Sequence, residues 1–360
     1  YKQCHIGDIY VERSQRGASD MVLLSVTMND GVMPRSEIEG KDNSSEDKSN
    51  YKVVRLGDMV YNSMRMWQGA NGISPCDGIV SPAYTVLMPK ASICNGYFAA
   101  LFKSPNLINE FRKNSQGMTS DTWNLKYPQI KTIKVHIPPL SEQNRVADML
   151  STLERRIAKQ TQLVETLKKY KRGLLHGLIS KTLRFSHKEK WGRVKLGKVF
   201  KERSERANGD EELLAVTINA GVQRRTNLDL KDNSSKDKSN YKRVQKGDIA
   251  YNTMRMWQGA SGASMYDGIV SPAYTVITPQ APDHVNIQFW AYYFKYAPLV
   301  QTFQKYSQGL TSDTWNLKFP QFSEIFVSNP PLEEQNEIAT MLQAIDQRIT
   351  SEEGRLSSIC

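Results

Sequence analysis

The sequence predicts an α+β protein built from two tandem, similar α/β domains that are separated by two long helices. Two observations support this prediction. One segment occurs twice at a spacing of about 190 residues, and a proline-led stretch with regularly spaced apolar residues follows each copy. A period of this length is far beyond that of solenoid repeats, so each copy is expected to be a globular domain of its own.

The size and composition of the chain suit two or three soluble domains. The 360 residues include 48 Lys and Arg against 37 Asp and Glu, which gives a net charge of +11. This surplus favours polyanionic partners, nucleic acid before acidic membranes. We expect neither a membrane span nor a secretory signal, because no apolar run approaches the roughly 18 residues that a span needs.

The cysteines predict neither a zinc site nor a disulfide framework. They are scattered, form no CxxC pair and have no histidine at ligand spacing. Free thiols of this kind suit a reducing compartment, so we expect a cytoplasmic protein. The four residues are Cys4, Cys76, Cys94 and Cys360.

The repeat is close in its central part. Lys41–Lys90 and Lys231–Gln280 are identical at 36 of 50 positions. Further on, Ser115–Pro128 matches Ser307–Pro320 at an offset of 192 rather than 190 residues. Two residues were therefore inserted in the variable stretch near Asn95 or Val285, which predicts a surface loop there.

Local patterns predict both strands and helices within each copy. The segments GDMVYNSM and PAYTVLMP indicate strands bounded by Gly, Asp and Pro. One short amphipathic helix per copy is predicted for SPNLINEFRKN and for YAPLVQTFQKY. Each copy is thus expected to mix strands with short helices.

A long helix is predicted after each Pro-Pro pair, at 138–139 and at 330–331. The apolar residues of both helices follow a heptad seam, interrupted by Gln160 and Lys171 in the first helix and by Glu352 in the second. Such a seam indicates a coiled coil, with packing inside a helical bundle as the alternative. We expect the two helices to pair, because an exposed seam needs a partner. The seam residues are Val146, Leu150, Leu153, Ile157, Val164, Leu167 and Leu174, and then Ile338, Leu342, Ile345, Ile349 and Leu356.

The order of these parts resembles the specificity subunit of type I restriction-modification enzymes. IPPLSEQNRVADMLSTLERRI and NPPLEEQNEIATMLQAIDQRI look like the starts of that family's two spacer helices. LKKYKRGLLHGLIS looks like the end of its first spacer helix, and KLGKVFKERSER and TSDTWNLKFP are similar to blocks that open and close its recognition domains. The resemblance covers nearly the whole chain.

The resemblance implies a domain plan and a function. It implies target-recognition domains at 1–137 and 185–329 and spacer helices at 138–184 and 330–360 that form an antiparallel coiled coil. Each recognition domain would read one half of a bipartite duplex DNA target. Methyltransferase subunits and an ATP-driven restriction subunit would be the partners, and the chain itself would have no catalytic residue, metal or cofactor.

Three repeated blocks carry side chains suited to contact DNA. The first is a polar loop in which Lys41, Asn43 and Lys48 correspond to Lys231, Asn233 and Lys238. The second holds Arg65, Trp67 and Gln68, which correspond to Arg255, Trp257 and Gln258. The third holds Gln116, Thr119, Ser120, Asp121, Trp123 and Lys126, which correspond to Gln308, Thr311, Ser312, Asp313, Trp315 and Lys318.

Each block also has a purely structural interpretation. The first is equally typical of a solvated loop. In the second, Met64, Met66 and Trp67 could belong to the core and Arg65 to a structural ion pair, whereas Gly69 relieves steric bulk and suits the close approach of a backbone. The third could be a capping turn that starts a short helix. The second and third blocks are the stronger contact candidates.

The near identity of the two copies leads to a hypothesis about the target. If the helices pair antiparallel, two similar readers face opposite directions, which predicts a near-palindromic target with half-site centres one helical turn apart, roughly 34–36 Å.

The main alternative function is that of a nuclease or DNA methyltransferase with fused recognition domains. A further possibility is a coiled-coil scaffold that does not bind DNA. The patterns that point to catalysis are incomplete. GRVKLGK has Val199 where a phosphate-binding loop needs Ser or Thr. Asn329-Pro-Pro-Leu lacks the aromatic residue of aminomethyltransferases.

Overall fold

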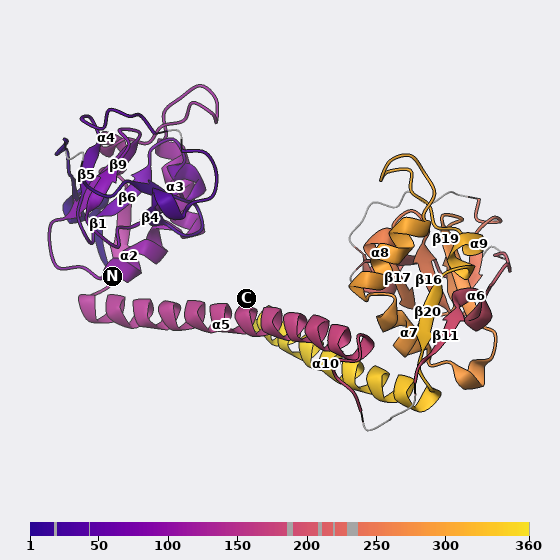
Figure 1. Ribbon diagram of the computed structural model, residues 1–360. Coiled ribbons are helices and arrows are strands. Elements are labelled where there is room, and N and C mark those ends of the chain that lie inside the picture. The colour runs from indigo at the N-terminus through magenta and orange to yellow at the C-terminus, as the bar shows by residue number, and fades with distance from the viewer. Residues whose placement is uncertain are drawn as a thin grey trace. The chain divides into compact units, whose positions relative to one another are not determined.

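The computed structural model describes residues 1–17, 20–42, 44–185, 190–207, 211–218, 220–228 and 237–359. It divides into two compact units, Tyr1–Ala158 and Lys159–Cys360. The boundary falls inside the long helix α5 (Leu140–Ile179), which is continuous across it (Figure 1). The two units are described one at a time.

The first unit is centred on a four-stranded antiparallel sheet in the order β2-β9-β6-β7. Three two-stranded antiparallel ladders, β1–β10, β3–β4 and β5–β8, surround it. Its strands are β1 (Lys2–His5), β2 (Tyr10–Glu12), β3 (Leu24–Val26), β4 (Val32–Pro34), β5 (Lys52–Val54), β6 (Met59–Asn62), β7 (Asn71–Ile73), β8 (Gly78–Val80), β9 (Tyr84–Pro89) and β10 (Lys134–Ile137). Its helical segments are α1 (Ile6–Ile9), η1 (Arg35–Glu37), η2 (Met66–Gln68), α2 (Asn95–Phe102), α3 (Pro105–Asn114) and α4 (Tyr127–Ile130).

The second unit repeats this order, with the sheet β12-β19-β16-β17 at its centre and the ladders β11–β20, β13–β14 and β15–β18. Its strands are β11 (Gly192–Lys195), β12 (Phe200–Glu202), β13 (Leu214–Thr217), β14 (Gly221–Arg224), β15 (Lys242–Val244), β16 (Ile249–Asn252), β17 (Ser261–Ala263), β18 (Gly268–Val270), β19 (Tyr274–Pro279) and β20 (Phe326–Asn329). Its helical segments are α6 (Leu196–Val199), η3 (Arg225–Asn227), η4 (Met256–Gln258), η5 (Pro282–His284), α7 (Ile287–Tyr293), α8 (Ala297–Tyr306), α9 (Phe319–Ser323) and α10 (Leu332–Ile359). The turn η5 precedes Val285, in the stretch where the sequence predicts an insertion.

The central strands β6 and β9 consist largely of apolar residues because both faces of the sheet are buried. On β6, Met59 and Tyr61 pack into the cluster formed with the helices, whereas Val60 between them packs into a separate cluster with Val54 and Val86. Successive side chains of a strand point to opposite faces, so one strand serves two cores. The same alternation recurs around Ala250 in the second unit.

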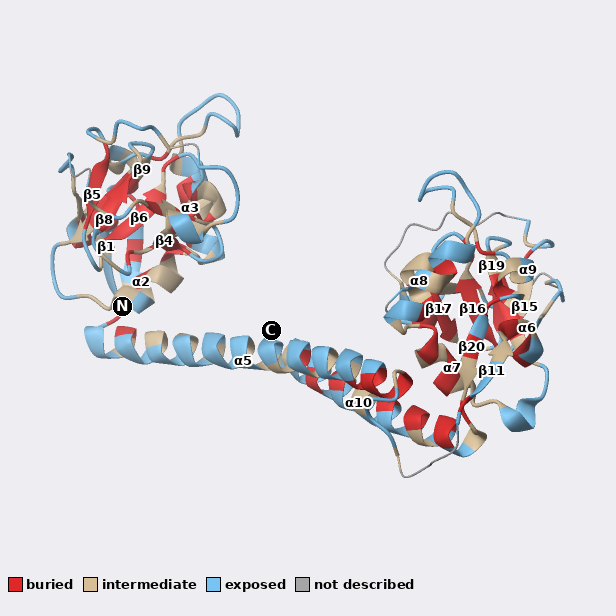
Figure 2. Cartoon of the chain, in the orientation of Figure 1, coloured by how far each residue is buried: buried red, intermediate tan, exposed pale blue. Residues whose placement is uncertain are grey.

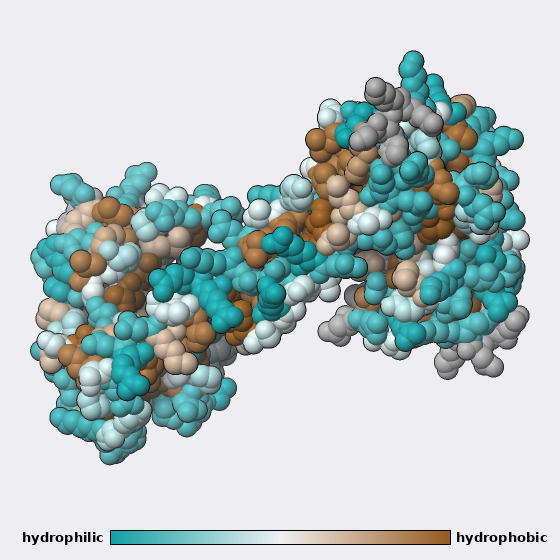
Figure 3. Space-filling view, turned by 90° about the horizontal axis from the view of Figure 1, so that it is seen from below, coloured by the Kyte–Doolittle hydropathy of each residue, from teal (hydrophilic) through white to brown (hydrophobic). Residues whose placement is uncertain are grey.

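On the face drawn in Figure 3, hydrophilic residues predominate and apolar residues lie in patches between them. The chain has a mean hydropathy of −0.53. Within the described residues, no helix is both long enough and apolar enough to cross a membrane.

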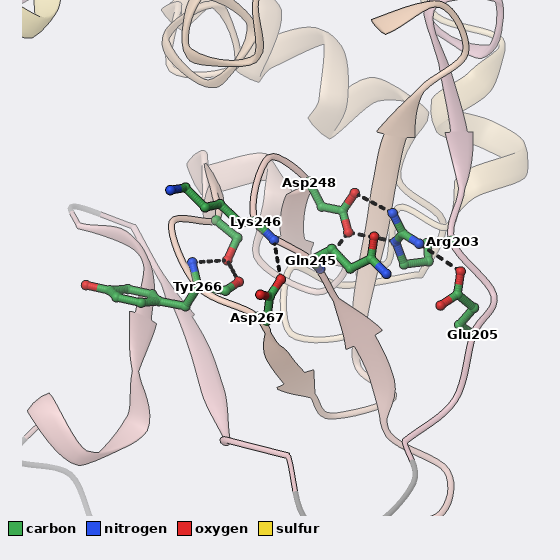
Figure 4. Close-up of polar contacts among 8 residues, drawn as sticks. Arg203, Glu205, Gln245, Lys246, Asp248, Tyr266 and Asp267 are labelled. Atoms are coloured by element: carbon green, nitrogen blue, oxygen red, sulfur yellow. Dashed lines mark hydrogen bonds and ion pairs between the residues drawn. The ribbon is translucent and has the colours of Figure 1, made fainter.

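In each unit, a buried aspartate stabilises the turn before a central strand, β6 in the first unit and β16 in the second. In the second unit Asp248, which is 2% exposed, accepts bonds from Nε and Nη2 of Arg203 at 2.7 and 3.0 Å and from the backbone N of Gln245 at 2.8 Å (Figure 4). Asp58 binds Arg13 in the same two-pronged way in the first unit. The Asp at this turn is therefore repeated for a structural reason.

A buried glutamine fixes the start of each long helix. Gln143 donates to the carbonyl of Pro138 at 3.0 Å and accepts from the backbone N of Cys94 at 3.1 Å. Gln335 makes the equivalent bonds to Pro330 and to Asn286 N. The Pro-Pro-Leu-x-Glu-Gln pattern thus joins each long helix to a helix of the preceding domain.

In the second unit α10 pairs antiparallel with the residues of α5 from Lys159 onward. Gln160 contacts Glu352, and further along α5 Lys171 contacts Asp346, so the numbers rise on one helix as they fall on the other. Figure 2 shows buried residues, in red, along the stretch where the two helices run side by side.

The predicted seam residues differ in burial. The buried ones are Val164, Leu174, Ile338, Leu342 and Ile349. The half-buried ones are Leu167, Ile345 and Leu356 in the second unit and Val146, Leu150, Leu153 and Ile157 in the first unit.

Candidate nucleic-acid interface

The Arg-Met-Trp-Gln block forms a 3-10 turn at the end of β6. Met66 is fully buried and anchors the turn, whereas Arg65 is exposed and Met64 is 44% exposed. Gly69 ends the turn with φ of +87° and donates its N–H to the carbonyl of Met66. The glycine therefore suits this left-handed conformation, and the predicted close approach of a backbone at this position stays a prediction.

The side chains of this turn are only partly used internally. Trp67 is half-buried, and its indole N–H donates to the Met64 carbonyl at 3.1 Å. Arg65 donates from Nη1 to Oε1 of Gln68 at 3.2 Å and makes no ion pair within the described residues. The guanidinium and the amide therefore lie next to each other at the surface, with donors left over for a ligand.

The Gln-Gly-Met-Thr block is a short hairpin loop and not the start of a helix. Gln116 and Asn124 exchange backbone hydrogen bonds at 3.0 and 2.8 Å. Inside the loop, Thr122 Oγ1 donates to the Thr119 carbonyl at 2.9 Å and accepts from Thr119 N at 3.1 Å. Gly117 has φ of +148°, and a Cβ there would lie 2.6 Å from the Thr122 carbonyl oxygen.

The second unit builds the same loop. Gln308 and Asn316 pair through their backbones, Thr311 and Thr314 bond each other, and Gly309 has φ of +138°. These loops lie between α3 and α4 and between α8 and α9, and Figures 1 and 2 show each as an exposed segment extending from its own unit. Within this third block, the exposed side chains among the predicted contact residues are Gln116, Thr119, Ser120, Asp121, Lys126, Gln308, Thr311, Ser312, Asp313 and Lys318.

The two stronger candidate blocks meet through a pair of tryptophans. Trp67 contacts Trp123 edge to face, with ring centroids 5.1 Å apart and planes at 78°. The backbone N of Leu125 also donates to the Ser63 carbonyl at 2.8 Å. Blocks more than fifty residues apart in the sequence therefore form one surface.

The corresponding surface in the second unit has the same construction. Trp257 contacts Trp315 at 5.2 Å and 87°. Nη1 of Arg255 lies 3.5 Å from Oε1 of Gln258, and the indole N–H of Trp257 donates to the Met254 carbonyl at 2.9 Å. We call these two surfaces the tryptophan-linked surfaces.

The lysine-rich loop is partly structural. Lys48 donates to the Ser45 carbonyl at 2.9 Å and lies over the ring of Tyr51, and Lys238 is half-buried. Lys41 is exposed. Asn43, Lys231 and Asn233 lie outside the described residues.

Sequence reasoning did not find one lysine in each unit that donates to backbone carbonyls of nearby turns. Lys295 donates to the carbonyls of Gly259 and Ile218, and its burial lowers its pKa to about 8. Lys103 in the first unit donates to the carbonyls of Met28 and Asn29, both at 3.2 Å. The only signal in the sequence is that the repeat has lysine at both positions.

Metal ligands and thiols were the other groups to consider among the residues that the structure describes. They contain no group of three or more His, Cys, Asp and Glu placed to hold a metal ion. Cys4, Cys76 and Cys94 are free thiols.

Solved structures of specificity subunits share this fold. An HsdS subunit from Thermoanaerobacter tengcongensis aligns with 99% of this chain and 93% of its own, at 16% identity and a TM-score of 0.54. A type I restriction-modification S subunit from M. genitalium aligns with 99% of this chain and 92% of its own, at 13% identity and a TM-score of 0.58. The predicted fold class, two similar α+β domains with a pair of long antiparallel helices, is confirmed.

The family model for the type I restriction modification DNA specificity domain matches residues 21–169 and 188–359. The chain belongs to this family, as its resemblance predicted.

Curated relatives are named as specificity subunits of type I restriction enzymes. The putative type I restriction enzyme MjaX specificity subunit of Methanocaldococcus jannaschii is 25% identical over 185 residues, which cover 45% of this chain and 42% of the relative. The type I restriction enzyme EcoKI specificity subunit of Escherichia coli is 31% identical over 110 residues, 29% of this chain and 22% of the relative. The matches thus span less than half the length of these curated relatives.

Proposed function

We propose that this chain is the DNA-binding specificity subunit of a type I restriction-modification enzyme. The observation that carries the proposal is the tryptophan-linked surface, which occurs once in each unit with the same residues and the same contacts. Arg beside Gln is a combination suited to base edges, because Arg pairs with guanine and Gln with adenine through two bonds each in the major groove. The exposed Lys126 and Lys318 suit phosphates.

The target is bipartite and near-palindromic in this proposal. Each unit reads one half-site, and the near identity of the two surfaces favours two similar half-sites in inverted orientation. Residues 1–137 and 185–329 act as the target-recognition domains, and the long helices separate them. Two unrelated half-sites in the methylated motif would contradict this part.

The partners are methyltransferase subunits and a restriction subunit, and the chain itself has no catalytic role. Its family membership supports this assignment, because the chemistry of such an enzyme then belongs to other subunits. The complex acts on DNA in the cytoplasm.

Two measurements test the proposal. Fluorescence anisotropy with labelled duplex DNA is expected to show binding whose log K falls linearly with log salt concentration. Co-expression with a modification subunit, followed by mapping of methylated adenine, is expected to give one bipartite motif. A scaffold that does not bind DNA predicts no salt-dependent binding.

A nuclease or DNA methyltransferase with fused recognition domains is the alternative. Incubation of the purified chain with DNA and Mg²⁺, or with DNA and S-adenosylmethionine, separates the two. Cleavage or methylation by the chain alone would overturn the proposed function.

A further inference from the structure

Each of the two hairpin loops carries one apolar side chain that touches nothing. Met118 in the first unit and Leu310 in the second are both 100% exposed. They occupy the same position of the repeat, between Gly and Thr, where every near neighbour in the loop is polar or glycine. Single exposed apolar residues are common, but here the exposure recurs in both copies while the residue changes from Met to Leu.

The loop presents this side chain on a fixed backbone. The Gln116–Asn124 pairing closes the base of the first loop, and the Thr119–Thr122 bonds brace the residues that follow Met118. The positive φ of Gly117 places the tip in a conformation that other residues rarely adopt. A tip that is already ordered loses little conformational entropy when it binds.

The base of the loop belongs to the proposed DNA-contacting surface. Trp123 contacts Trp67 on one side, and exposed Lys126 follows the loop directly. The tip therefore projects from a surface whose side chains suit base edges and phosphates.

We propose that Met118 and Leu310 are wedges that insert between adjacent base pairs, one in each half-site. This inference rests on the proposed function, since it names what the loop tips do on the DNA. Leu and Met are among the side chains that partly unstack a base step and kink the duplex, and the hydroxyls of Thr119 and Ser120 can bond the flanking backbone. Pyrimidine–purine steps are the easiest to unstack, so the wedges favour such a step in each half-site.

Duplex DNA fits this tip better than an apolar protein surface. A stable protein interface needs a contiguous patch with an apolar centre, whereas each loop offers one apolar side chain within a polar hairpin. One narrow side chain with polar flanks matches the gap between two stacked base pairs, whose faces are apolar and whose edges are polar.

The test uses the full chain with its co-expressed modification subunit and a duplex that carries the mapped methylation motif. 2-Aminopurine is placed at successive positions of each half-site, leaving out the methylated adenine, and its fluorescence reports loss of stacking. The variants are Met118→Ala, Leu310→Ala and the conservative Met118→Leu. Leu56→Ala is the matched control, because Leu56 is 69% exposed in the same unit and its counterpart is Lys246.

We expect a fluorescence increase at one step in each half-site with the native protein. Met118→Ala is expected to abolish it in one half-site only and Leu310→Ala in the other, each with about tenfold weaker binding. Met118→Leu and Leu56→Ala are expected to behave like the native protein. A mismatch at the unstacked step is expected to restore the affinity of the alanine variants, because the step is then already open.

The outcomes separate the wedge from the function on which it rests. Specific binding without any fluorescence increase, or an increase that survives both alanine substitutions, overturns the wedge and leaves the proposed function in place. Unchanged DNA binding with weakened binding of the modification subunit assigns the tips to a protein contact, which also overturns it. Absence of duplex binding by the native complex overturns the proposed function itself.

Discussion

Gln160 on α5 donates its amide N–H to Glu352 on α10, with 2.8 Å to the carboxylate Oε2 and 2.9 Å to the backbone carbonyl. Both are the residues that interrupt the apolar heptad seam. Glu352 is only 7% exposed and also accepts from Arg355 at 3.1 Å. A polar pair at a seam position favours one alignment of the helices over shifted ones, because a shift would leave a buried carboxylate without its donor.

This pair predicts a pH-dependent contribution of Glu352 to stability. The hydrogen bond from Gln160, followed by the charge of Arg355, lowers the pKa of Glu352 below its ordinary value of 4.5. A lowered folded-state pKa means that the stabilisation is present above pH 4.5 and is lost as the pH falls through the folded-state value. Glu352→Gln is expected to lower the midpoint of thermal unfolding at pH 7 and to have progressively less effect below pH 4.5.

The matched control is Glu353→Gln. Glu353 follows Glu352 on α10 and pairs with Lys168 of α5 at the surface, and such exposed pairs contribute little. Circular dichroism melts of the three proteins between pH 3 and pH 7 check the prediction. An equal effect of both substitutions at all pH values would show that the seam pair has no special role.

The tryptophan contact predicts that each loop acts on one half-site. Trp123→Ala removes an edge-to-face contact worth roughly 0.5–1.5 kcal/mol and frees the loop from the Arg65 turn. We expect relaxed base preference in one half-site and an unchanged other half-site, as mapped by methylation in cells. Trp315→Ala is expected to give the mirror-image result. Relaxation of both half-sites by one substitution would indicate a general loss of folding instead.

Substitutions of Gln68 and of Lys126 are expected to change DNA binding in different ways, although both residues lie on one surface. Gln68→Ala is predicted to relax the preference at particular base pairs, because an amide can pair with adenine through two bonds. Lys126→Ala is predicted to weaken binding to all duplexes and to reduce the slope of log K against log salt by about 1. Anisotropy titrations at several salt concentrations measure both effects, with exposed Lys134 on β10 as the control lysine. An unaltered base preference in Gln68→Ala would make Gln68 a structural residue.

The sequence alone predicted the parts of this molecule that depend on repetition and periodicity. The doubled domain follows from the identity between Lys41–Lys90 and Lys231–Gln280, and the helix pair follows from the seam that Leu342 and Ile349 share with α5. The four-stranded sheet was not predicted, because short strands such as β2 and β7 carry too few residues for a recognisable pattern.

The candidate site was predicted as separate blocks but not as one surface. Nothing in the spacing of Trp67 and Trp123 indicates that their rings touch, since that contact depends on the path of the chain between them. Lys48 shows the same limit: its amine donates to the Ser45 carbonyl of its own loop, a bond that the sequence does not indicate, and its contact with DNA stays a prediction.

The buried carboxylate of the second unit predicts a large loss of stability on substitution. Asp248→Asn removes the buried, two-pronged charged partner of the Arg203 guanidinium, whose side chain is 13% exposed, and leaves only the ion pair with the exposed Glu205. Breaking a buried pair costs up to about 3–5 kcal/mol. Asp267→Asn is the control, because Asp267 is exposed and accepts one backbone bond from Lys246 at 2.8 Å. Thermal unfolding is expected to shift strongly for Asp248→Asn and weakly for Asp267→Asn, and similar shifts would contradict the structural role of this carboxylate.

Gly309 and Gly117 predict that the shape of each loop matters for DNA binding more than for folding. A Cβ on Gly309 would lie 2.5 Å from the Thr314 carbonyl oxygen, and φ of +138° is unfavourable for any other residue. Gly309→Ala is therefore expected to distort the exposed hairpin while the core around Phe303 and Leu317 stays packed. Unfolding midpoints are expected to fall by a few degrees at most, whereas base preference in one half-site is lost. Gly354→Ala on α10, where a Cβ meets nothing within 4 Å, is the control and is expected to leave base preference unchanged and to raise the unfolding midpoint slightly, because Ala favours the helix over Gly. Retained preference in Gly309→Ala would show that the hairpin takes no part in reading DNA.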